Sequence, residues 1–376
     1  MQKVSVAIVG AGNVTNSIHV PAWRSLKNVE VTAICDINKE KAERCAKIWK
    51  IPKVYTEFEE LLEAAKDENT IIIDICTPPS THASLSVKAM EAGFNVMLEK
   101  PMAMNIGDCR KIMNEYRRRR EEVKLCVIHN FLFALPMLRI KSIIERRKLD
   151  ILGVDIRMLH TPEDEMISDR NHWVHSLPGG RFGENLIHPV YVLRNLLGEL
   201  TIGDVYVAKR GDYEWVSYDE LYVTFHSNNK KFGSIYISFN SPRWSSLFNI
   251  AIYSKELIIK YDGTNQTLIM QGPLLPGYLS NLNKVYNRYH VKLKILKDVA
   301  QTSMQIVGPA VSSLISRLVK KIFRIKREKS GHTYLFEAFI NSILNQSDLP
   351  YTPEEAYDAT ITFLKVINRI SKKEYL

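Results

Sequence analysis

Short apolar runs alternate with amphipathic helical stretches over the first 128 residues of the chain. The runs are rich in Val and Ile, which favour strands, and polar turn segments separate them from the helical patterns. Strands are expected at residues 4–9, 29–35, 71–76, 95–98 and 123–128. Strands that alternate with helices predict parallel pairing, because each helix carries the chain back across the sheet. We therefore expect an α/β domain at residues 1–128 with a doubly wound parallel sheet.

The pattern changes after residue 128. A helical stretch at 135–147 leads to a run of strands that are joined by turn signals such as Ser227-Asn228-Asn229. These strands are expected at residues 153–160, 204–209, 219–226, 231–240, 247–253, 256–261 and 267–271. The meander predicts an α+β domain at residues 129–376 with a large, mostly antiparallel sheet, and we assign the last two helices, which begin near Gly331 and Pro353, to this domain. Its open sheet face could bury against another copy, so a homodimer or homotetramer is expected.

A glycine-rich turn follows the first strand. Gly10 permits a tight turn, and Gly12 lets the backbone approach a pyrophosphate. Asn13 and Val14 lead into a helix whose amino terminus would face the phosphates. Thr15 replaces the last glycine of the usual fingerprint and places a side chain where helix and strand pack closely. The combination of strand, glycines and helix predicts a Rossmann domain that binds a dinucleotide.

Charged side chains also stand at two strand ends. Asp36 ends the second strand, at the spacing at which a carboxylate accepts from the ribose hydroxyls of adenosine, which favours NAD over NADP. Lys100 closes the strand at 95–98 within the sequence Glu99-Lys100-Pro101. Ligands bind beyond the carboxyl ends of parallel strands, so Lys100 is expected in the cleft. The alternative is a solvated lysine at the end of a strand.

Several motifs together resemble those of the Gfo/Idh/MocA oxidoreductases. They are the start Ala7-Ile8-Val9-Gly10-Ala11-Gly12, the loop Thr77-Pro78-Pro79 with His82, and Glu99-Lys100-Pro101. Family members also carry a glycine-rich stretch that leads to an aspartate and, four residues later, a histidine. Glu184 and His188 occupy these two positions, and Trp173 matches an aromatic residue that precedes the glycines. The resemblance implies that NAD is bound by Gly10, Gly12, Asn13, Val14, Asp36, Thr77, Pro78, His82, Glu99 and Lys100.

The resemblance also implies hydride transfer between the nicotinamide and a secondary carbinol of a sugar, a cyclitol, or a nucleotide-linked or lipid-linked sugar. This chemistry needs a group that takes or gives the hydroxyl proton. Lys100 would hold the reacting oxygen and His188 would relay its proton, and either could be the formal base. Glu184 would bind an adjacent hydroxyl or orient His188. The alternatives are a sensor that binds the dinucleotide or a sugar without catalysis, and a glycoside hydrolase that uses bound NAD.

Other positions depart from the family pattern and indicate an unusual substrate. Leu132 stands where an arginine often follows the asparagine of the sixth strand, Leu186 replaces a glycine, and Tyr191 replaces an acid. His172 and His175, like Arg181, could supply polarity or serve as structural residues. The expected substrate contacts are Lys100, Asn130, Trp173, Arg181, Glu184 and His188.

A basic segment at residues 284–330 carries the whole net charge of the chain. It holds 12 Lys or Arg and 2 Asp or Glu, a net of +10, and the whole chain has 51 minus 41, also +10. Apolar residues recur at helical spacing between Val311 and Phe323, with basic residues on the other side. Such an amphipathic segment would bind an anionic membrane surface, or equally would pack on a neighbouring subunit. It is too polar to span a bilayer, and nucleic acid is not expected because the segment has few aromatic residues for stacking.

The remaining residues indicate an ordinary reduced protein. Five cysteines lie in the first domain without the spacing of a metal site, which predicts reduced thiols and a cytoplasmic location. No histidine pair or acid cluster predicts a metal. The chain starts in a core strand, so no signal peptide is expected.

Overall fold

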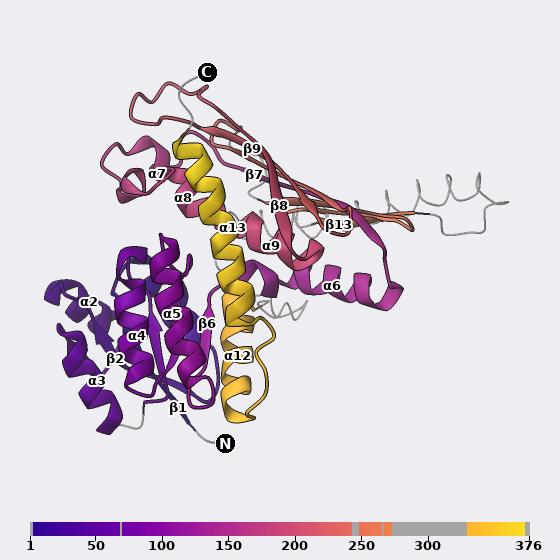
Figure 1. Ribbon diagram of the computed structural model, residues 1–376. Coiled ribbons are helices and arrows are strands. Elements are labelled where there is room, and N and C mark those ends of the chain that lie inside the picture. The colour runs from indigo at the N-terminus through magenta and orange to yellow at the C-terminus, as the bar shows by residue number, and fades with distance from the viewer. Residues whose placement is uncertain (1–2, 68–69, 243–247, 265–266, 273–328, 373–376) are drawn as a thin grey trace, which may run out of the picture. The chain divides into compact units, whose positions relative to one another are not determined.

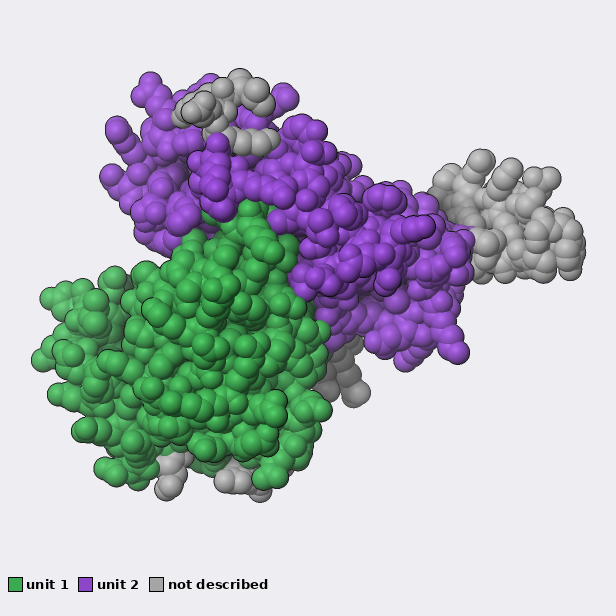
Figure 2. All heavy atoms as spheres, in the orientation of Figure 1, with its two compact units in different colours: residues 1–135, 329–367 green, residues 136–328, 368–376 purple. Residues whose placement is uncertain are grey.

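Figure 1 shows a computed structural model of the 376-residue chain. The structure describes residues 3–67, 70–242, 248–264, 267–272 and 329–372. The chain divides into two compact units, which Figure 2 distinguishes by colour. Unit 1 comprises residues 1–135 and 329–367, and unit 2 comprises residues 136–328 and 368–376.

Unit 1 is built on a six-stranded sheet in which every neighbouring pair is parallel, with the order β3-β2-β1-β4-β5-β6. Its strands are β1 (Val4–Val9), β2 (Val29–Cys35), β3 (Lys53–Tyr55), β4 (Ile72–Ile75), β5 (Asn95–Leu98) and β6 (Leu125–Val127). The prediction of a doubly wound parallel sheet is confirmed. The strand order reverses between β1 and β4, and this switch point is where such folds open a crevice for ligands. Strand β3 was not predicted, because it has three residues, of which two are exposed.

Two helices of unit 1, α2 and α5, begin at asparagine caps that the sequence provides. Asn38 accepts a hydrogen bond from the Lys41 N–H at 2.9 Å, and Asn105 does the same for Asp108 at 2.8 Å. Helices α4 and α5 pack on each other (Figure 1). The helical segments are η1 (Thr15–His19), α1 (Val20–Arg24), α2 (Lys39–Trp49), α3 (Phe58–Asp67), η2 (Pro79–Thr81), α4 (His82–Glu91), α5 (Ile106–Arg119), η3 (Asn130–Phe133), α12 (Gly331–Leu344) and α13 (Pro353–Ser371).

The chain returns to unit 1 through α12 and most of α13. Phe336 stacks on Trp23 of α1 with ring centroids 4.1 Å apart. A side chain at Gly331 would come within 2.2 Å of the Asn130 carbonyl oxygen, so this helix starts in close contact with η3. Residues 329–367 therefore group with the parallel sheet, whereas the sequence assigned them to a domain at 129–376.

Unit 2 contains a seven-stranded sheet with the order β13-β12-β11-β7-β10-β9-β8. Among the described strands of this sheet, only the β7–β10 pair is parallel, so the prediction of a mostly antiparallel sheet is confirmed. Helix α9 packs against β7 and β10 and is buried on almost every side. The strands are β7 (Ile151–Leu159), β8 (Leu200–Ala208), β9 (Glu220–Ser227), β10 (Phe232–Ser238), β11 (Asn249–Ser254), β12 (Ile258–Asp262) and β13 (Thr267–Gln271), and the helices are α6 (Leu135–Arg147), α7 (Glu165–Ser168), η4 (Trp173–Ser176), α8 (Arg181–Asn185) and α9 (Ile187–Leu197).

The predicted basic segment at residues 284–330 lies outside the described residues, apart from Lys329 and Ser330. Across the described part of the chain, no helix combines the length and the apolar character needed to traverse a bilayer.

Candidate active site

The glycine turn joins β1 to the first helix at the switch point of the parallel sheet. Gly10 has a φ of +98°, and a Cβ there would lie 2.3 Å from the backbone oxygen of Cys76 at the end of β4. A glycine is therefore required by the close approach of two strand ends. A Cβ at Gly12 would meet no atom within 4 Å. Gly12 thus leaves room for a ligand against the backbone, as a bound pyrophosphate would need.

Thr15 is accommodated, although the sequence suggested a conflict at this position. Its side chain is fully buried, and its hydroxyl donates to the Gly10 carbonyl at 2.7 Å. The helix starts with a π-type turn over Thr15–His19, in which the Val20 N–H bonds to the Thr15 carbonyl. The threonine therefore ties the glycine turn to the helix in place of the missing glycine.

Asp36 stands directly beside this turn. One carboxylate oxygen accepts from the Ala11 N–H at 2.7 Å, and the other accepts from the Asn38 N–H at 2.8 Å. These bonds fix a negative charge next to the glycine turn. A carboxylate in this place repels a 2′-phosphate, so the arrangement agrees with NAD better than with NADP.

The residues that follow β4 and β5 form the next part of the same sheet edge. His82 is fully buried, and its ring nitrogens lie 2.9 Å from the Pro101 oxygen and 3.0 Å from the Thr77 oxygen. Burial lowers the pKa of His82. His82 therefore connects the loop after β4, which includes Pro78, to the loop that carries Lys100.

Glu99 forms its hydrogen bonds with groups inside the protein. It is 8% exposed, and its Oε1 lies 2.9 Å from Nε2 of His19. Its Oε2 accepts from the Lys100 N–H at 3.0 Å. Burial would raise the pKa of this carboxyl, but the hydrogen bond and charge of His19, with smaller effects of nearby cationic groups, lower it to about 2. Glu99 thus joins His19 to the backbone of Lys100, and its expected contact with the cofactor stays a prediction.

Unit 2 holds Glu184 and the buried Arg181 in one ionic cluster. Arg181 is 6% exposed, and its guanidinium lies 2.6 Å from Glu184 and 2.9 Å from Asp164. It also donates to Asn185 at 2.7 Å. The structure therefore places Arg181 between carboxylates, where it fixes Glu184.

His188 is buried on α9, with 9% of its surface exposed. Its Nδ1 lies 2.9 Å from the hydroxyl of Tyr191, one turn later in the helix. Tyr191 replaces the usual acid at this position, and this contact fixes the orientation of the imidazole on α9.

The other sequence candidates in unit 2 have structural partners. His172 caps η4, and His175 bonds to the Asp169 carbonyl. Burial, with the charge of Arg181, lowers the pKa of His160 to about 4, so this ring is neutral at pH 7. Trp173 is half exposed.

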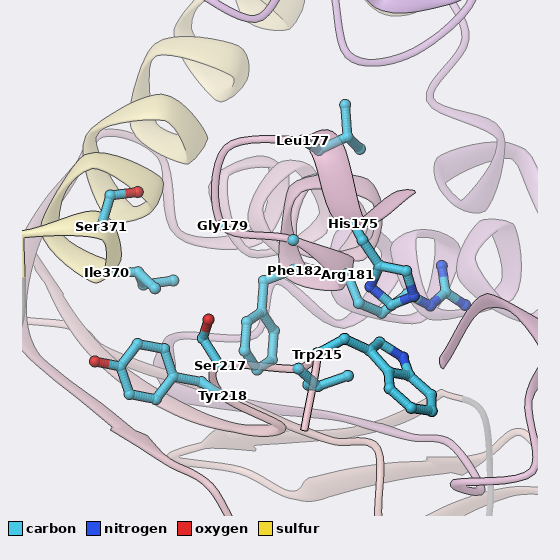
Figure 3. Close-up of a pocket in the computed structure, with 12 residues that line it drawn as sticks. His175, Leu177, Gly179, Arg181, Phe182, Trp215, Ser217, Tyr218, Ile370 and Ser371 are labelled. Atoms are coloured by element: carbon cyan, nitrogen blue, oxygen red, sulfur yellow. The ribbon is translucent and has the colours of Figure 1, made fainter. Parts of the chain in front are cut away.

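Unit 2 also contains a cavity of about 330 Å³. Its lining residues, shown in Figure 3, include His175, Arg181 and Trp215 but neither Glu184 nor His188.

Sequence reasoning missed four residues near Lys100: His19, Trp23, Asp74 and His332. All four belong to unit 1 and approach the end of β5 from distant parts of the chain. One signal was visible, because Asp74 interrupts a run of isoleucines in a buried strand.

Comparisons with known proteins agree with this geometry. Residues 4–127 match the family described as an oxidoreductase family with an NAD-binding Rossmann fold. D-glucoside 3-dehydrogenase of Escherichia coli is 28% identical over 134 residues, which are 36% of this chain and 37% of that protein. Myo-inositol 2-dehydrogenase of Thermotoga maritima is 23% identical over 197 residues, which are 52% of this chain and 55% of that protein. The chain thus matches about a third to a half of the length of these relatives.

The fold extends over the whole chain in solved structures. The WlbA dehydrogenase from Bordetella pertussis, in complex with NADH and UDP-GlcNAcA, aligns with a TM-score of 0.73 at 17% identity. The alignment covers 99% of this chain and 96% of that one. With the matched motifs at Gly10, Gly12 and Glu99-Lys100-Pro101, the amino-terminal domain is an NAD-binding Rossmann domain of the Gfo/Idh/MocA oxidoreductase family.

Proposed function

We propose that this protein is an NAD-dependent oxidoreductase that acts on a secondary carbinol of a sugar, a cyclitol or a nucleotide-linked or lipid-linked sugar. The observation that carries the proposal is Lys100 at the end of β5, on the edge of the parallel sheet that also holds the glycine turn and Asp36. The names of the sugar and inositol dehydrogenases among its relatives support the reaction class. The nucleotide sugar in the WlbA complex supports the inclusion of such substrates.

Each residue then has a defined task. The glycine turn and Asp36 would hold NAD, which supplies a hydride acceptor or donor at its nicotinamide. Lys100 would hold the oxygen of the reacting carbinol, because its ammonium donates hydrogen bonds and stabilises negative charge there. His188 would relay the hydroxyl proton, and either His188 or Lys100 could be the formal base. Glu184, fixed by Arg181, would accept a hydrogen bond from an adjacent hydroxyl.

The test is a turnover screen with NAD or NADH and a panel of free sugars, inositols and nucleotide sugars, followed by NADH absorbance. Lys100→Met and His188→Asn should each lower kcat by roughly a hundredfold or more, with NAD affinity nearly unchanged. Full activity of Lys100→Met would overturn the mechanism. No turnover across the panel would favour a sensor, and release of a free sugar without net NADH would identify a glycoside hydrolase.

We also propose that the open face of the seven-stranded sheet pairs with another copy of the chain. Tyr206 pairs in register with Tyr222 across β8 and β9, and these side chains are 55% and 41% exposed. Phe232 of β10, on the same face, is 68% exposed. An exposed aromatic row of this kind is typical of a protein interface. Light scattering should give a dimer or tetramer, and Tyr222→Glu should shift the protein toward the monomer.

The segment at 284–330 is proposed to attach either to an anionic membrane or to a neighbouring subunit. Sedimentation with anionic liposomes at physiological salt separates these cases when the full chain is compared with a variant that lacks residues 284–330. Equal pelleting of the two proteins excludes membrane binding. Loss of the oligomer in the shortened variant would then indicate the subunit contact.

A further inference from the structure

A histidine lies completely buried between two carboxylates beneath Lys100. The Nδ1 of His19 is 2.8 Å from Asp74, and its Nε2 is 2.9 Å from Glu99. His19 and Asp74 are both 0% exposed. Trp23 donates from Nε1 to the same Asp74 oxygen at 2.6 Å. His19 therefore joins the interior of β4 to the residue that follows β5.

This arrangement favours a charged imidazole ring. Both ring nitrogens face carboxylate oxygens, and only the imidazolium can donate to both. Burial opposes this charge, but the Asp74 carboxylate and the nearby Cys76 outweigh it and raise the pKa of His19 well above its ordinary value. The positive charge of His19 is thus paired with the two carboxylates that it contacts.

Two further ionisable groups face Glu99. One is Lys100 itself, and the other is His332 on α12, whose ring centroid lies 6.3 Å from that of His19. Burial lowers the pKa of His332 to about 4, so it is neutral at pH 7. The positive charges close to Glu99 at this pH are therefore His19 and Lys100.

The same histidine is mechanically connected to the glycine turn. It lies at the end of η1, the segment in which Thr15 bonds to the Gly10 carbonyl at 2.7 Å. On its other side, Glu99 accepts from the Lys100 N–H at 3.0 Å. A continuous set of contacts thus runs from Gly10 through η1 and His19 to Lys100.

We propose that His19 is a positioning residue that, through Glu99, fixes Lys100 relative to the dinucleotide-binding turn. The importance of the Lys100 position for catalysis rests on the proposed function. The claim that His19 fixes Lys100 does not. Apolar residues of similar volume often stabilise a fold as well as a buried ion cluster does, so the stability of the fold does not by itself require charges here. A fixed distance between two parts of the site does give a reason.

The first test needs no substrate. In NMR of protein with ¹⁵N-labelled histidine, both His19 nitrogens should carry protons at about pH 8, where an ordinary histidine is neutral. The resonance is assigned by its loss in His19→Gln. A neutral His19 at this pH would overturn the inference.

The second test measures the rate at which acetic anhydride labels Lys100 in the protein without substrate, by mass spectrometry. His19→Gln should slow labelling roughly threefold or more, because the released Glu99 carboxylate can pair with the lysine ammonium. Glu99→Gln should speed it, and this variant also decides the question if His19→Gln does not fold. Glu115→Gln is the matched control, since Glu115 is 8% exposed and bonds to Arg119 at 2.8 Å near the end of α5, at the opposite edge of the sheet.

Labelling of Lys100 that is unchanged in both folded variants would overturn the positional claim. Once a substrate is known, His19→Gln should lower kcat by roughly tenfold to a hundredfold while KM for NAD changes much less. Glu115→Gln should keep the wild-type kcat. If the wild-type protein turns over nothing, the proposed function fails, and the NMR and labelling results still decide the role of His19.

Discussion

The two glycines of the turn should respond to alanine in different ways. At Gly10 the added Cβ would lie 2.3 Å from the Cys76 oxygen and 2.8 Å from its carbonyl carbon. Both are backbone atoms, so no side-chain rotation relieves the overlap. The φ of +98° costs an L-residue about 1–2 kcal/mol, and displacing the two strand ends adds about 1–3 kcal/mol. Gly10→Ala should therefore lower the free energy of unfolding by roughly 2–5 kcal/mol.

Gly12→Ala is the matched partner in this experiment. A Cβ there meets no atom within 4 Å, so the free energy of unfolding should change by no more than about 0.5 kcal/mol. Dinucleotide affinity should fall instead, because the methyl group occupies the space that a pyrophosphate needs. Urea unfolding followed by fluorescence and calorimetric titration with NAD measure the two effects. A Gly12→Ala protein as destabilised as Gly10→Ala, or a Gly10→Ala protein of wild-type stability, would refute the reasoning.

Three further predictions concern buried polar side chains. The pKa of Glu99 falls from 4.5 to about 2 on folding, which stabilises the fold by roughly 3 kcal/mol. This stabilisation is present above pH 4.5 and is lost as the pH falls toward 2. In urea unfolding, the free energies of unfolding of the wild type and Glu99→Gln should therefore converge through this pH window. Thr15→Val should cost about 1–3 kcal/mol because the Gly10 carbonyl loses a buried donor, whereas Thr15→Ser should cost less in the same assay. Arg181→Met should cost roughly 3 kcal/mol and lower kcat, because Glu184 loses its buried partner; normal kcat with lowered thermal stability would show that the pair is only structural.

The sequence predicts the sheets well because their strands are long apolar runs with clear turns between them. The apolar pattern does not predict strand β3, because its three residues form no apolar run and pair with β2 through backbone hydrogen bonds. The sequence also does not predict where α12 packs. An apolar helix face predicts burial but not the partner, and the stacking of Phe336 on Trp23 joins residues more than 300 positions apart in the chain.

The candidate site is predictable where local geometry decides it and unpredictable where a distant partner does. The glycine turn and Lys100 follow from strand ends alone. Glu99 was predicted to contact the cofactor, and Arg181 was predicted either to contact the substrate or to be structural; in the structure each meets an opposite charge inside the protein. The partner of Glu99 lies 80 residues away in sequence, and no periodicity encodes such a pair. Charge type predicts that a residue needs a partner, and the fold decides which one it receives.

The three residues that depart from the family pattern are all buried. Leu132, Leu186 and Tyr191 are each 0% exposed, so these positions contribute packing to the core and offer no polar group to a substrate. In unit 2, the Tyr191 hydroxyl contacts Nδ1 of His188 at 2.9 Å, at a position where family members often carry an acid. Under the proposed function, Glu184 would contact an adjacent substrate hydroxyl, and Arg181 holds this carboxylate at 2.6 Å.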